Sequence, residues 1–179
     1  MDDPDDEQLE QRVRDALDGL PAHCEIIDCD PSLADTAAFC AHYGFSLDES
    51  ANCIVVAGKA AERTYVACLA LADTRLDVNG LIRKRLGVKR TSFASADETV
   101  AATAGMRIGG VTPFGLPADL PVWIDSRVVD RSRVIVGGGS RRCKVYVASS
   151  AFSTLPNVEI ITDLARPANP DPTSRGTGD

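Results

Sequence analysis

The chain has 179 residues, of which 44% are hydrophobic and 25% are charged, proportions typical of one globular domain. They exclude fibrous and wholly disordered proteins. The 26 acidic and 19 basic side chains give a net charge of −7, which excludes the strongly basic balance of a dedicated duplex-DNA binder. Residues 1–10 hold acids and no bases, so the remaining chain is close to neutral and local basic clusters keep their significance.

The expected cellular compartment follows from two sequence features, the length of the apolar runs and the charge of the N-terminal residues. No apolar run approaches the roughly 20 residues of a membrane-spanning helix, and the acidic N-terminus does not resemble a secretory signal. We therefore expect a cytoplasmic protein with no membrane partner. Six cysteines in a chain of this length are too few for a disulfide scaffold, so we expect free thiols.

In the first half of the chain, periodicity and end signals predict alternating helices and strands. Asp35 and Gly44 are the expected N-cap and C-terminal glycine of one helix, and Ser95 with Glu98 has the spacing of a capping box. The predicted helices cover residues 7–20, 36–43, 78–86 and 96–104, and the predicted strands cover residues 25–29, 53–58 and 64–70, with the last two forming a hairpin.

In the second half, glycines and prolines at positions 109–121 indicate a shaped loop that leads into a strand at residues 122–125. Further strands are predicted at 134–136, 145–148 and 158–161. Residues 167–179 are rich in proline and glycine and are expected to be a disordered tail. The pattern indicates one domain over residues 25–166, preceded by an acidic tip and a leading helix in residues 1–24.

Three common catalytic arrangements are poorly supported. His23 and His42 lie near cysteines, but no Cys-x-x-Cys pair is present, so we predict no metal and no cofactor. With both histidines in the first quarter of the chain, no nucleophile motif is recognisable. Residues 137–142 do not fit a phosphate-binding loop and are expected to be a hairpin turn.

The remaining candidate is the loop around Gly109 and Gly110. Adjacent glycines let the backbone approach a ligand and direct N–H groups at a developing oxyanion, and Pro113 stiffens the loop. The same pattern also fits a purely structural turn before a strand.

Three segments together resemble a known family: residues 109–115 (GGVTPFG), 120–125 (LPVWID) and 136–141 (VGGGSR). The chain is similar to the YbaK and prolyl-tRNA-synthetase-associated editing domains over about residues 30–164. The resemblance implies an α+β fold with a mixed, barrel-like sheet surrounded by helices. It also implies hydrolysis of amino acids wrongly attached to tRNA, with an aminoacyl-tRNA as partner and in some cases a synthetase.

The resemblance further implies the site residues. Asn52 stands where the family has a lysine, so a positive charge is missing unless Lys59 or Arg141 supplies it. Asn52, Gly109 and Gly110 are the candidate catalytic residues, with the glycine amides polarising the carbonyl. The candidate substrate-binding residues are Ile108, Val111, Thr112, Pro113, Phe114, Asp125, Gly138, Gly139, Ser140 and Arg141.

Two functions therefore stay open at this point. One is an aminoacyl-tRNA deacylase that acts in trans. The other is a binding module for a tRNA end or a small amino-acid-like ligand, which the absence of the lysine favours. An asparagine that simply begins a strand is the structural alternative for Asn52.

Basic residues form two clusters that could hold tRNA phosphates. The candidates for tRNA binding are Arg83, Lys84, Arg85, Lys89 and Arg90. A second group comprises Arg131, Arg133, Arg141, Arg142 and Lys144. A solvated helix face is the alternative interpretation of the first cluster.

Overall fold

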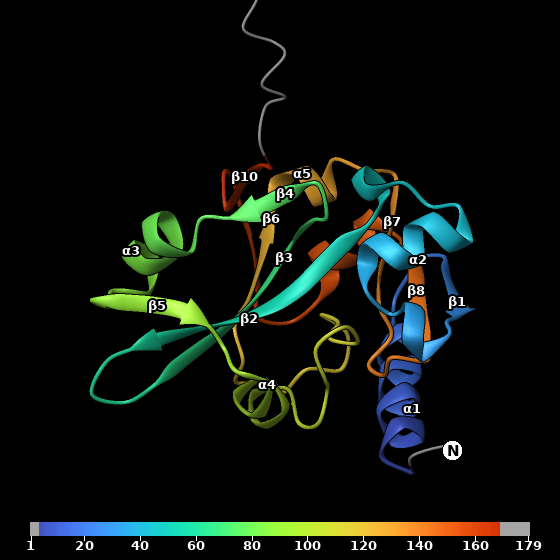
Figure 1. Cartoon of the computed structure of the whole chain (residues 1–179), viewed down its shortest axis with the longest axis horizontal. Helices are drawn as coiled ribbons and strands as arrows, with labels where there is room; N and C mark the ends of the chain where they lie inside the picture. Colours follow the sequence, from blue (N-terminus) through green and yellow to red (C-terminus); the bar gives the residue numbers. More distant parts are fainter. Residues whose placement is uncertain (1–3, 169–179) are drawn as a thin grey trace, which may run out of the picture.

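A five-stranded mixed sheet forms the largest layer of the protein, in a computed structural model that describes residues 4–168. Its strand order is β5-β2-β3-β6-β9, and the first four of these strands are labelled in Figure 1. The strands are β2 (Ala51–Lys59), β3 (Thr64–Leu71), β5 (Arg90–Phe93), β6 (Val122–Asp125) and β9 (Val158–Ile161). β5, β2 and β3 are antiparallel neighbours, whereas β6 runs parallel to both β3 and β9. The hairpin expected from the two apolar runs is confirmed.

A second, antiparallel sheet has the order β1-β8-β7. It consists of β1 (Cys24–Asp28), β7 (Arg133–Gly137) and β8 (Cys143–Ala148). An isolated bridge between Ser50 and Ile135 joins it to the start of β2, and β4 (Thr74–Leu76) pairs with β10 (Ala165–Pro167) in a short third ladder. The mixed α+β architecture is confirmed, but among residues 4–168 the ladders do not close into a barrel.

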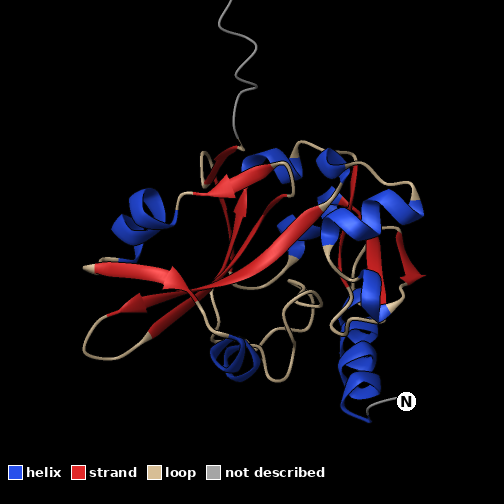
Figure 2. Ribbon diagram, viewed as in Figure 1, coloured by secondary structure: helices blue, strands red, loops and turns tan. Residues whose placement is uncertain are grey.

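Helices lie around both sheets (Figure 2). The α-helices are α1 (Pro4–Asp18), α2 (Thr36–Tyr43), α3 (Arg83–Leu86), α4 (Ala96–Ala102) and α5 (Ser126–Val129). Helical turns of other types are the 3₁₀ turns η1 (Pro31–Leu33), η2 (Leu47–Glu49) and η4 (Ser149–Thr154) and the π-helical turn η3 (Val78–Ile82). Within residues 4–168, none of these helices combines the length and apolar character needed to cross a bilayer.

The predicted helix ends are set by local hydrogen bonds. The Asp35 carboxylate accepts from the backbone N–H groups of residues 37 and 38, and Gly44 ends α2 in the left-handed region. Ser95 and Glu98 form the complete capping box that opens α4. These predicted helix ends are confirmed. They could be predicted from the sequence because each depends on residues within about one helical turn.

Several short elements differ from expectation. The helix predicted at 78–86 begins as the π-helical turn η3, whose Asp77 carboxylate accepts from the N–H of Leu81, and only then becomes α3. The strands β4, β5 and β10 and the helix α5 were not predicted. β5 is polar along most of its length, so its pairing with β2 gives no apolar alternation in the sequence.

The main hydrophobic core lies between the two larger sheets and includes α1. Leu9, Val13 and Leu17 of α1 are buried in that core, so the leading helix is part of the same folded unit. At the other end, Pro167 does not start a tail; it is the last residue of β10 and pairs with Thr74 of β4. Residues 1–3 and 169–179, which carry the rest of the predicted acidic tip and tail, lie outside the described residues.

Candidate active site

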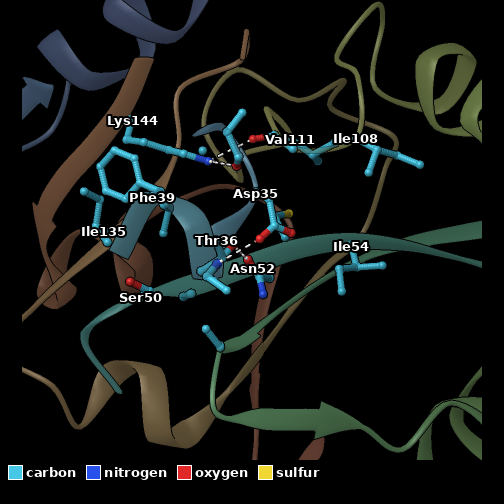
Figure 3. A pocket seen from close by; sticks show the side chains of 18 of the residues that line it. Asp35, Thr36, Phe39, Ser50, Asn52, Ile54, Ile108, Val111, Ile135 and Lys144 are labelled. Carbon is cyan, nitrogen blue, oxygen red and sulfur yellow. Dashed lines mark hydrogen bonds between the residues drawn. The ribbon is translucent and has the colours of Figure 1, made fainter. Parts of the chain in front are cut away.

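A cavity of about 550 Å³ lies beside the Ser50–Ile135 bridge, where the two larger sheets meet. Its walls come from the start of α2, the first half of β2, the loop at residues 108–111 and the adjacent ends of β7 and β8 (Figure 3). Most of the lining is apolar, with a few polar groups. Both the volume and this composition are typical of a small-molecule site.

Asn52 on β2 lines this cavity together with Thr36 at the start of α2. The Thr36 hydroxyl donates to the Asn52 Oδ1 over 2.5 Å (Figure 3). Among the described residues, the Asn52 amide nitrogen has no hydrogen-bond partner. The oxygen of Asn52 is therefore held by the protein, whereas its two N–H donors remain for a ligand or a water molecule.

The glycine loop contributes Ile108, Gly109 and Val111 to the same cavity. Gly109 has a φ of +93°, and a Cβ added there would lie 2.6 Å from the Arg141 side chain. The Gly110 N–H donates to the carbonyl of Arg107 over 2.9 Å. Gly110 does not line the cavity. Within residues 4–168 the backbone N–H groups of the three loop residues that do line it, Ile108, Gly109 and Val111, make no hydrogen bond, and Gly109 lies at the centre of this group.

Two basic side chains hold the glycine loop against the segment before α2. Arg141 donates to the carbonyls of Ile108 and Pro31, both over 3.0 Å. Lys144 donates from Nζ to the carbonyls of Ala34 and Gly109, both over 2.9 Å. The carbonyls of two successive loop residues are therefore fixed by two separate cations.

Of these two cations, Lys144 lines the cavity and Arg141 does not. The Lys144 side chain is only 6% exposed, and its Nζ lies 5.6 Å from the centre of the Phe39 ring (Figure 3). Burial away from water lowers the pKa of Lys144 below its ordinary value. The cavity therefore contains a poorly solvated amine.

Large apolar side chains surround the mouth of the cavity. Leu47 is 43% exposed, Phe93 57% and Ile108 58%, and all three belong to its lining. They account for most of the large exposed hydrophobic residues of the described chain. A concentration of exposed apolar surface at a cavity mouth is typical of a ligand contact.

Four of the expected substrate-binding residues lie elsewhere. Thr112 is fully buried outside the cavity lining, and Pro113 lines a separate cavity of about 260 Å³ beside the end of α1. Phe114 is buried, with its ring stacked on that of Phe152. Asp125 is 1% exposed, caps α5 and accepts from the N–H of Ala165 over 2.8 Å. These side chains support the fold around the site.

The expected residues 138–140 also lie behind the cavity rather than in its wall. A Cβ added to Gly139 would lie 2.8 Å from Val13 of α1, and the Ser140 hydroxyl donates to Glu10 over 2.6 Å. Gly138 packs against Cys143. Gly137 is the residue of this turn that lines the cavity, so α1 supports the turn from outside.

The first basic cluster occupies α3, the following turn and the start of β5, and none of its residues lines the cavity. Arg85 is already engaged, since it pairs with Glu159 and lies 5.4 Å from the Trp123 ring centre. Arg83 donates from Nε to the carbonyl of Asn79. Lys59 lies opposite Arg90 at the far end of β2, away from the residues that line the cavity.

The side chains of residues 4–168 include no group of three or more His, Cys, Asp or Glu placed to hold a metal ion. All six cysteines are free thiols, and Cys24 is the one that is not buried. Burial raises the pKa of Cys53, which lines the cavity, to about 12. That thiol is protonated at neutral pH, which argues against a cysteine nucleophile.

The family is decided by residues 30–155, which match the model of the aminoacyl-tRNA editing domain. The chain belongs to this family. Hypothetical protein APE2540 has a similar crystal structure, with 22% identity and a TM-score of 0.74, over 87% of this chain and 99% of that one. A proposed trans-editing enzyme for prolyl tRNA synthetase is also similar, with 21% identity and a TM-score of 0.73, over 90% and 98% of the two chains. No curated protein sequence matches the chain.

The cavity residues of this editing domain that the sequence does not indicate include Thr36, Phe93 and Lys144. Thr36 was assigned only to the first turn of a helix, and Phe93 lies in a strand that was not predicted. Lys144 was grouped with exposed arginines, although it follows Cys143 within an apolar strand. Lysines are rarely buried, and the burial of Lys144 follows from the place of β8 between β1 and β7, which the sequence does not indicate.

Proposed function

We propose that this editing domain hydrolyses the ester bond of mischarged aminoacyl-tRNA and acts in trans. The proposal rests on one observation above all: the free amide of Asn52 and the unpaired N–H of Gly109 belong to the same apolar cavity. An ester carbonyl placed between them has one donor for its oxygen and one group to orient water. The family to which the chain belongs supplies the substrate class.

The reaction requires no nucleophilic side chain. A water oxygen adds to the acyl carbon, and the carbonyl electron pair moves onto the acyl oxygen. When the carbonyl re-forms, the bond to the ribose oxygen breaks and that oxygen takes a proton, which leaves a free amino acid and a ribose hydroxyl. In this proposal Asn52 orients the water and the Gly109 N–H donates to the acyl oxygen.

The lining indicates the substrate side chain that fits. Alanines, valines, isoleucines and glycines form most of the wall, and Asp35 is the only acidic residue in it. The Asp35 carboxylate is directed to the backbone of α2. We therefore expect a small, uncharged amino acid inside the cavity.

The mouth fits the terminal adenosine of tRNA. The ester is carried on the ribose of this nucleoside, so the base must lie just outside the cavity when the acyl group lies inside. Phe93 presents an exposed aromatic ring at that place, and nucleobases stack on such rings without regard to sequence. The basic cluster at residues 83–90 is then the candidate contact for tRNA phosphates further from the site.

The experiment compares purified wild type with two variants on tRNAs mischarged with alanine, serine or cysteine. We expect the wild type to release amino acid faster than buffer, and Asn52→Ala and Gly109→Ala to lose most of that acceleration. Asn79→Ala, which changes an exposed asparagine on η3, is the matched control. If none of the substrates is hydrolysed above the buffer rate, the deacylase proposal is wrong.

A binding module is the second candidate, favoured because Asn52 is uncharged where the family has lysine. It predicts that the protein binds a non-hydrolysable amide analogue of alanyl-adenosine, that Asn52→Ala weakens this binding, and that esters are not cleaved. Isothermal titration of the analogue, run beside the hydrolysis assay, separates the two functions.

A further inference from the structure

We propose that Lys144 is the oxyanion-binding cation of the cavity and replaces, from β8, the lysine that is absent from β2. This inference rests on the proposed function and adds a substrate-contacting residue to it. Within the described lining, Lys144 is the only side chain with a cationic group. The acyl oxygen that becomes negative during hydrolysis is the group that it would contact.

The geometry leaves one donor of the ammonium for a ligand. An ammonium group has three N–H bonds in a tetrahedral arrangement. Two of them point to the carbonyls of Ala34 and Gly109, which belong to residues of the cavity wall. Figure 3 shows these two hydrogen bonds of Nζ. The protein provides no third partner for Nζ within residues 4–168, so we assign the third N–H to the contents of the cavity.

The charge balance also indicates an anionic ligand group. No described carboxylate forms an ion pair with Lys144, and its two protein partners are neutral carbonyls. A buried cation without a counter-ion is costly, and a negative charge placed beside it interacts more strongly than it would in water. A transient alkoxide in the cavity supplies that charge only when the reaction needs it.

The other candidate cations are excluded by their positions. Lys59 lies at the far end of β2, and Arg141 donates both terminal nitrogens to carbonyls without lining the cavity. Lys144 also bonds the carbonyl of Gly109, the residue whose N–H we propose as the second oxyanion donor. The hydrogen bond between Lys144 and the Gly109 carbonyl therefore fixes the two proposed donors, the Lys144 ammonium and the Gly109 N–H, relative to each other.

During the reaction, Lys144 stays protonated throughout. As the water oxygen bonds to the acyl carbon, the third N–H of Lys144 donates to the acyl oxygen, which gains the carbonyl electron pair. When the carbonyl re-forms, that hydrogen bond weakens, the acyl–ribose bond breaks and the ribose oxygen takes its proton from the attacking water. No proton is transferred from Nζ.

The first test is kinetic. Lys144→Gln removes the charge and retains a side-chain amide with two N–H donors. We expect kcat for deacylation to fall by about 10²- to 10³-fold, the usual effect of removing one oxyanion donor, with a smaller change in KM. Lys59→Gln is the matched control and should leave kcat unchanged. A folded Lys144→Gln variant with kcat within threefold of wild type would overturn the proposal.

The pH dependence gives a readout that a structural role would not produce. The ammonium is lost as the pH rises through the lowered pKa of Lys144. As the pH is raised, wild-type kcat should therefore start to fall at a lower pH than the one at which an ordinary lysine deprotonates. This decrease should be absent from the residual activity of Lys144→Gln. Buffer rates must be subtracted at each pH, and a decrease that persists in the variant would contradict the proposal.

A binding test remains valid even if the protein cleaves no ester. Two adenosine analogues of the alanyl ester are compared, one with a negatively charged phosphonate at the acyl position and one with a neutral amide. We expect wild type to bind the phosphonate at least tenfold more tightly than the amide, and Lys144→Gln to lose this preference. A preference retained in the variant refutes the role of Lys144, whereas failure of hydrolysis alone refutes only the deacylase.

Discussion

Replacing Arg141 with methionine should separate stability from activity. The variant keeps an apolar stem but loses the hydrogen bonds to the carbonyls of Ile108 and Pro31. Buried charge-assisted bonds are worth about 1.5–3 kcal/mol each, but the Arg141 side chain is partly exposed and screened by solvent. We therefore expect the free energy of unfolding to fall by only about 1 kcal/mol in total.

The effect on catalysis should be larger because Gly109 depends on this anchor for its position. A displacement of the order of 1 Å at a catalytic group costs about 10²-fold in rate, and we expect kcat/KM for deacylation to fall by about that factor. Urea unfolding measures the stability, and amide hydrogen exchange measures the mobility of Gly110, whose N–H bonds the carbonyl of Arg107.

The matched control is Arg75→Met, which removes an exposed arginine from β4. It should change neither the rate nor the exchange. If Arg141→Met leaves kcat/KM within threefold of wild type while Gly110 exchanges faster, the loop does not need its fixed shape and the reasoning about Gly109 is wrong.

Three further predictions follow from the mouth, the thiols and the basic cluster. Phe93→Ala should raise KM by about 5- to 150-fold, because a stacked base contributes about 1–3 kcal/mol. Ile160→Ala, at an exposed apolar residue outside the cavity lining, should not change KM. If the two substitutions raise KM equally, the proposed contact between Phe93 and the terminal adenosine is wrong. The raised pKa values of Cys53 and Cys143, about 12 and about 11, keep both thiols protonated at pH 8, so they should react with a maleimide only after unfolding. Fast labelling of either thiol in the native protein would contradict the described burial. Binding of tRNA should weaken with salt, and Arg83→Glu should reduce the slope of log Kd against log salt; an unchanged slope would exclude this cluster as a phosphate contact.

The sequence was most informative where structure depends on near neighbours. Asp35 and Gly44 define both ends of α2, and the spacing of Ser95 and Glu98 defines the start of α4. Each of these features is completed by hydrogen bonds within a few residues. The strand at residues 122–125 is also predicted with its observed bounds, because its apolar residues follow Pro121 directly, although its partners β3 and β9 are distant in the sequence.

The composition of the cavity depends on distant segments and was predicted only in part. Asn52, Ile108, Gly109 and Val111 were expected at one site and line one cavity. Asp125 was expected there too, but its carboxylate accepts from the backbone of a strand near the end of the described chain. Nothing close to Asp125 in the sequence indicates that partner.

The pairing of β1 with β8 has a consequence for how this domain is made. Residues 24–28 leave the ribosome well before residues 143–148, which are their hydrogen-bond partners. Pairing between segments so far apart in the sequence is slow to form, and the nascent first strand has no β8 partner until those residues are synthesised. The β1-β8-β7 sheet therefore cannot form until β8 has been synthesised, and an N-terminal fragment that ends before β8 should leave β1 accessible to chaperones and proteases.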